Sequence, residues 1–143
     1  MVKQHLFPDF KSITHQLERG YFPNLKSFIE IVFFNRLKYI KSNLLTFKVF
    51  VSEALYNASV RKEINKGLPN NLILSLNFQL ENLKFRHLLI NWPNSTIIEF
   101  LVYNFLGFVL NQLILFNPKN KTQIDQAADT MITFLSRGLA PIP

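Results

Sequence analysis

The side chains that could carry out chemistry are few and lie far apart along the chain. Cysteine is absent, which excludes disulfides and thiolate nucleophiles. The three histidines, His5, His15 and His87, include no pair at the spacing of metal ligands. Four glutamates are also isolated, with no carboxylate three or four positions away: Glu30, Glu53, Glu81 and Glu99. Because acid–base catalysis needs positioned partners, we expect no enzyme, no metal site and no cofactor.

The glycines do not form a nucleotide-binding loop. Gly20, Gly67 and Gly138 each fall where a helix is expected to end. Gly107 instead falls inside an apolar helical stretch, where it costs about 1 kcal/mol relative to alanine. It is either a tolerated defect or a point where a crossing helix can approach closely, and we favour the second interpretation.

Aromatic side chains are the best candidates for binding a ligand. They make up 14% of the sequence and include fifteen phenylalanines. An ordinary bulky core explains them about as well, but large flat side chains in a small helical domain also tend to leave clefts between helices. The predicted ligand-binding residues are Phe28, Phe34, Phe47, Phe50, Phe78, Trp92, Tyr103 and Asn104. The expected ligand is a small apolar effector, with asparagine side chains orienting it.

Apolar residues recur at helical spacing along the whole chain, which predicts a single all-α domain over 1–143. The expected fold is an antiparallel bundle of about six helices. The longer predicted helices span 9–19, 24–41, 44–57, 69–89, 95–116 and 122–137, with a brief helix between 59 and 67. Residues 74–80 alternate like a strand, but no turn or partner strand is evident nearby.

Polar residues before these segments predict where the helices begin. Asp9 is expected to open the first helix and Ser59 the brief one. Thr96 with Glu99 matches a capping box, and Thr122 with Asp125 is expected to start the last helix. Asn117 and Pro118 are expected to stop the helix before it.

Residues 94–139 are predicted to form two helices, each with two apolar rows. A helix with two apolar rows packs against two neighbouring elements. In the first helix, one row contains Ile98, Val102, Leu106, Val109, Leu113 and Phe116. The other row contains Ile97, Leu101, Phe105 and Phe108. We interpret one row as packing on its own domain and the other on a second copy of the chain. The predicted dimer-interface residues are Leu101, Phe105, Phe108, Gln112, Ala127, Met131, Phe134 and Leu135.

The net charge of +7 is unevenly distributed. Residues 1–90 contain 13 Lys/Arg and 6 Asp/Glu, whereas residues 91–143 contain three of each. The basic part is either an ordinary solvated surface or a surface near nucleic acid or an acidic partner. Depletion of charge after residue 90 is typical of the core of an interface.

A membrane-spanning helix over 97–116 is disfavoured because this stretch contains Glu99, Asn104, Asn111 and Gln112. The first ten residues contain no apolar run typical of a secretory signal. We therefore expect a soluble cytoplasmic protein with no membrane partner.

The order of these segments resembles the C-terminal regulatory domain of TetR/AcrR-family transcription regulators. Three passages carry the resemblance: 43–64, with its Glu-Ala step, 97–116, which is similar to the penultimate helix, and 124–141, with its closing Arg-Gly-Leu step. Together they cover most of 24–141.

This resemblance implies a homodimer joined by a four-helix bundle of the last two helices of each subunit. It also implies a pocket for a small apolar effector among the earlier helices. The family binds DNA through an N-terminal helix-turn-helix, which residues 1–23 are too short to contain, so DNA binding is expected only through that missing domain. The alternatives are a helical carrier of small molecules and a membrane-surface domain, both without a link to DNA.

Overall fold

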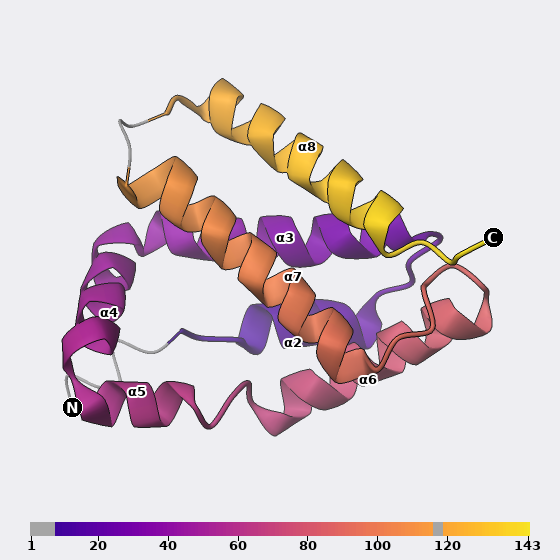
Figure 1. Cartoon of the computed structure of the whole chain (residues 1–143), viewed down its shortest axis with the longest axis horizontal. Coiled ribbons are helices and arrows are strands. Elements are labelled where there is room, and N and C mark those ends of the chain that lie inside the picture. Colours follow the sequence, from indigo (N-terminus) through magenta and orange to yellow (C-terminus); the bar gives the residue numbers. More distant parts are fainter. Residues whose placement is uncertain (1–7, 116–118) are drawn as a thin grey trace.

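In the computed structural model, residues 8–115 and 119–143 are described, and their secondary structure is helical throughout, with no strand among them. This confirms the all-α prediction, including the helical assignment of 74–80. The elements, shown in Figure 1, are α2 (Lys11–Arg19), α3 (Leu25–Ser42), α4 (Leu44–Tyr56), α5 (Ala58–Ile64), α6 (Asn70–Phe85), α7 (Asn94–Val109), its π-helical continuation η1 (Leu110–Leu115), and α8 (Lys121–Gly138).

Helix α3 is the centre of the arrangement. It packs against α8 along much of its length, and it also contacts α2 and α4. Helix α7 crosses in front of it (Figure 1), and α2 in turn packs against α6. Its buried side chains repeat every three or four residues and so form one broad apolar face: Leu25, Phe28, Ile29, Phe33, Leu37 and Ile40. The hydrophobic core of the described residues is built around that face.

Asparagines cap three of the helices, and one of them, Asn24, lies where the sequence predicts the helix over 24–41 to begin. Asn24 and Asn120 each form a reciprocal capping box, at the starts of α3 and α8. Asn57 caps α5, accepting hydrogen bonds from the backbone N–H groups of Ser59 and Val60. The amide oxygen of asparagine suits this position well because it can accept bonds from the otherwise unpaired N–H groups of the first turn.

The predicted caps at Ser59, Thr96 and Thr122 are therefore wrong. Each of these residues lies inside the first turn of its helix, because the helix begins earlier than expected. At α7 the carbonyl of Pro93 accepts the first backbone bond, from the Ile97 N–H, and no side chain caps the helix. Asp9 does accept a bond from the Lys11 N–H at 2.9 Å, although Phe10 holds the N-cap position of α2. The predicted stop at Asn117 and Pro118 lies outside the described residues.

Helix α6 ends at Phe85, four residues before its predicted end. The guanidinium of Arg86 donates to the Phe22 carbonyl at 2.7 Å, and His87 adopts a left-handed conformation with φ of 60°. This reverses the chain, so that Ile90 is buried and its N–H donates to the Leu139 carbonyl at 2.8 Å. The end of α8 is thereby tied to the segment between α6 and α7.

One buried polar side chain fixes the end of α2. Gln79 on α6 is 4% exposed, and its amide nitrogen donates to the carbonyls of Leu17 at 2.7 Å and Gly20 at 3.2 Å. The carbonyls in the last turn of a helix lack partners within the helix, so this amide satisfies groups that burial would otherwise leave unpaired.

Replacing Gln79 with alanine is expected to lower the free energy of unfolding by about 1–3 kcal/mol, because two carbonyls lose their donor inside the protein. Gln126→Ala, at an exposed position of α8, is the matched control and should change stability little. Urea denaturation followed by circular dichroism measures both. Equal effects of the two substitutions would contradict this role for Gln79.

Candidate functional site

The structure does not gather the predicted ligand-binding residues into one pocket. Phe28 and Phe47 are buried in the core. Phe47 contacts Phe50, with ring centroids 6.3 Å apart, whereas Phe28 packs edge-on against Phe22. The other aromatic members are substantially exposed on different elements: Phe34 on α3, Phe78 on α6, Tyr103 on α7 and Trp92 in the segment before α7.

The remaining member of that set is occupied within its own helix. The side-chain nitrogen of Asn104 donates to the carbonyl of Phe100, four residues earlier in α7, at 2.8 Å. An amide held in this way is not oriented toward a ligand. Aromatic composition alone could not reveal this dispersion, because it does not report the direction in which each side chain points.

A surface depression of about 480 Å³ lies elsewhere, where the start of α3 meets the turn after α6 and the end of α8. Its polar lining includes Asn24, Ser27 and His87. Asn24 and Ser27 already hydrogen bond each other in the capping box of α3. None of the predicted ligand-binding residues lines this depression.

Within residues 8–115 and 119–143, no cluster of three or more His, Asp or Glu could hold a metal ion. Burial lowers the pKa of Arg36, while Tyr39 and Asp9 act in the opposite direction. Its guanidinium lies over the rings of Phe10 and Tyr39, 5.1 and 4.7 Å from their centroids, and donates to the Asp9 carbonyl. An arginine remains charged in proteins, so this one anchors the segment before α2.

The buried face of α7 combines both predicted rows. Ile97 and Phe108 come from one row, Ile98 and Val109 come from the other, and all four are buried within their own chain. Assigning one row to the domain and the other to a partner was therefore wrong. The two rows are displaced by a single residue, or about 100° around the helix, so together they form one broad face.

That face meets α3 through aromatic contacts. The ring of Phe33 on α3 lies 5.0 Å from the rings of both Phe105 and Phe108, with edge-to-face geometry in each case. Edge-to-face aromatic pairs stabilise a fold by more than the burial of their apolar area alone. Phe33 therefore holds the middle of α7 in place.

The opposite side of α7 is apolar and uncovered. Tyr103, Leu106 and Gly107 are exposed there, beside the half-buried Phe100. Within the helix from Asn94 to Leu115, the most apolar stretch of 18 residues has a mean hydropathy of 1.7, yet only 22% of that stretch is buried. By length and composition alone it could cross a membrane. Glu99 is the single charged residue in those 22 positions.

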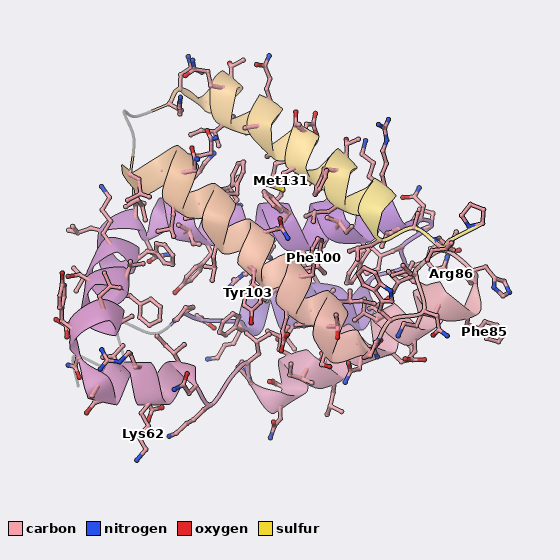
Figure 2. All side chains as sticks on the ribbon, in the orientation of Figure 1. Lys62, Phe85, Arg86, Phe100, Tyr103 and Met131 are labelled. Carbon is pink, nitrogen blue, oxygen red and sulfur yellow. The ribbon has the colours of Figure 1, made fainter. Side chains whose placement is uncertain are left out.

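Helix α8 repeats this division into a covered and an uncovered face. Ile124, Ala128, Ile132 and Leu135 are buried, and α8 packs along α3. Met131, a predicted dimer-interface residue, is not part of this covered stripe, in which Ile132 lies between Ala128 and Leu135. Figure 2 shows Met131 on the side of α8 toward α7. It belongs to a neighbouring stripe of half-buried or exposed residues: Ala127, Met131, Phe134 and Gly138.

The predicted dimer-interface residues are thus divided. Phe108 and Leu135 are buried in their own chain and are not available as surface contacts. Leu101, Phe105 and Gln112 are half-buried, as are Ala127 and Met131, and Phe134 is exposed. We define the α7–α8 surface by its uncharged members: Phe100, Tyr103, Leu106, Gly107, Ala127, Met131, Phe134 and Gly138. Phe100 and Leu106 are not among the predicted interface residues, and Tyr103 was predicted to bind a ligand.

No protein-family model, curated protein or solved structure matches the chain. The fold and the α7–α8 surface define the class of this protein: it is all-helical over the described residues, with an uncovered apolar surface on its last two helices.

The contrast between the neighbouring residues Phe33 and Phe34 tests this packing. Phe33 is 3% exposed and Phe34 is 37% exposed, and both lie in α3, so replacement by alanine changes helix propensity equally. Phe33→Ala is expected to lower the free energy of unfolding by about 3–5 kcal/mol through cavity formation. Phe34→Ala should cost less than half as much. Thermal or urea denaturation of the two variants measures the difference, and equal losses would contradict the contact between α3 and α7.

Proposed function

We propose that this chain is the subunit-pairing and effector-sensing domain of a TetR/AcrR-type transcription regulator. The observation that carries the proposal is the uncovered α7–α8 surface. It lies on the two helices that resemble the dimerisation helices of that family. The resemblance of 43–64, 97–116 and 124–141 supports the regulatory class.

Charge favours a second copy of the chain as the partner on this surface. Residues 91–143, which contain this surface, hold equal numbers of acidic and basic side chains. All of the excess positive charge lies in residues 1–90. Two copies that meet through α7 and α8 therefore bury apolar groups without pairing like charges, which is the composition typical of an interface core.

The shape of the surface also suits helix packing. Cβ atoms built at Gly107 and Gly138 would meet nothing within 4 Å. Neither glycine is required by a contact inside the chain, so both leave the backbone open to a helix from outside. This supports the interpretation of Gly107 as a point of close approach, at the cost of helix propensity.

In this proposal an apolar effector acts by binding one dimer arrangement better than another. An effector with equal affinity for both arrangements would not change their populations. DNA contact belongs to a helix-turn-helix supplied by sequence outside these 143 residues, with half-sites about 34 Å apart. The protein is then cytoplasmic, and its own residues perform no catalysis.

Phe134→Lys tests the pairing directly. Phe134 is 60% exposed on the α7–α8 surface, whereas Phe78, 69% exposed on α6, is a matched control outside it. The wild-type chain and Phe78→Lys are expected to run as dimers. Phe134→Lys should run as a monomer with unchanged helix content, because two lysines would be buried without partners in a symmetric contact. Light scattering coupled to size exclusion measures the mass.

A monomeric wild-type chain at micromolar concentration would overturn the pairing claim. Phe134→Lys that remains a clean dimer would also overturn it. The apolar length of α7 gives a membrane as the second candidate occupant of this surface. That candidate is favoured if the wild-type chain is monomeric and floats with neutral phosphatidylcholine vesicles, and if Phe134→Lys abolishes the flotation.

Effector binding is tested by a thermal-shift screen with lipophilic compounds. A compound at one hundred times its Kd should stabilise the folded chain by about 2.7 kcal/mol through mass action. Polar analogues of each hit serve as controls and should shift the midpoint less. A screen in which no compound raises the midpoint would contradict the sensing role and leave the pairing role intact.

A further inference from the structure

Helix α4 has a second uncovered apolar surface that the proposed function does not use. Its sequence is strongly apolar, yet Phe47 is its one buried residue. Leu45 and Tyr56 are 77% and 85% exposed, and Val49 and Leu55 are exposed as well. Leu45, Val49 and Tyr56 follow one another at helical spacing and so share one side of the helix. We call these four residues the α4 stripe.

Helix α4 lies at one end of the molecule, opposite the C-terminus (Figure 1). It is separate from the α7–α8 surface, which belongs to the last two helices. Helix α4 contacts α3 and the short helix α5, and neither covers the stripe. The outward side of one helix at the end of the molecule presents a ridge, not a groove, to a partner.

Basic residues are concentrated in the sequence around the stripe. Residues 36–66 contain seven Lys/Arg and two Asp/Glu, which is most of the excess charge of the chain. Lys41 precedes α4, Lys48 lies within it, and Lys62 lies on α5, where Figure 2 shows its side chain pointing away from the body of the chain. All three are exposed, and none takes part in an ion pair among the described residues.

We propose that the α4 stripe docks on an anionic lipid surface. Exposed aliphatic and tyrosine side chains can enter the interface between headgroups and acyl chains, while lysines around them meet anionic headgroups. A second copy of the chain is disfavoured here because two strongly basic ends would repel each other. Partner helices are usually received in grooves, and nucleic acids are bound by phosphate contacts and base stacking, in which leucine and valine have no part.

The first test measures co-sedimentation of the full chain with vesicles of phosphatidylcholine, alone or mixed with phosphatidylglycerol. Binding to the mixed vesicles is expected, with much weaker binding to the neutral ones. The triple variant Lys41→Gln, Lys48→Gln and Lys62→Gln should bind on the order of a hundredfold more weakly, since each lysine contributes about 1 kcal/mol near an anionic surface. The control triple Lys26→Gln, Lys119→Gln and Lys121→Gln removes the same charge elsewhere and should bind much more tightly than the first triple.

The second test concerns the apolar side chains. Leu45→Ser with Tyr56→Ser should abolish binding to the mixed vesicles. Phe78→Ser with Phe85→Ser removes two similarly exposed apolar side chains from α6 and should preserve it; Figure 2 shows Phe85 at the opposite end of the molecule. All four positions are exposed, so circular dichroism should show folded protein in each variant.

Three outcomes would overturn the proposal. They are absence of binding to mixed vesicles, equal losses in the two lysine triples, and full binding by the Leu45 and Tyr56 variant. If the Leu45 and Tyr56 variant binds duplex DNA of random sequence as tightly as it binds vesicles, binding depends on charge alone and the surface binds polyanions in general. Loss of binding in Phe134→Lys alone would assign membrane contact to α7. Because the subunit-pairing test reads mass and this one reads vesicle binding, either proposal can fail without the other.

Discussion

The fold depends on the burial of one face of α3. Its six buried side chains lie against elements from both ends of the chain, with α8 packed along the helix, α7 crossing it and α2 alongside. Phe33 joins the two halves most directly, since its ring meets both Phe105 and Phe108 edge-on. A buried phenylalanine contributes about 1.5–3 kcal/mol through transfer from water, and its close packing makes the loss on removal larger.

The helices around α3 have more apolar surface than α3 can cover. Helix α7 shows this most clearly, with little of its hydrophobic surface buried, and α4 buries a single residue. Extended apolar surface on a soluble protein usually marks an interaction site. The two surfaces differ in the charge of the sequence that contains them, because residues 91–143 hold three Lys/Arg and three Asp/Glu whereas residues 36–66 hold seven and two. That difference is the physical reason for assigning them different partners.

The candidate site shows what the helical spacing of apolar residues can predict and what it cannot. Helical spacing identified α3, α7 and α8 and the break near Asn43 because apolar side chains on one face must recur every three or four residues. It could not separate Ile97 from Ile98, since both edges of a broad buried face satisfy the same period. The ligand-binding prediction depended on where aromatic rings point, and Phe33 and Phe34 show that neighbouring residues of one type can have opposite environments.

The all-helical class, the unequal distribution of charge and the absence of thiol chemistry follow from the sequence alone, because composition and local periodicity determine them. Tertiary structure decided that Phe108 and Leu135 are covered, that Gln79 binds the end of α2, and that Tyr103 and Leu106 remain in solvent. These outcomes depend on the angles at which α6, α7 and α8 approach their neighbours. Such angles result from packing between residues distant in sequence, which no local pattern contains.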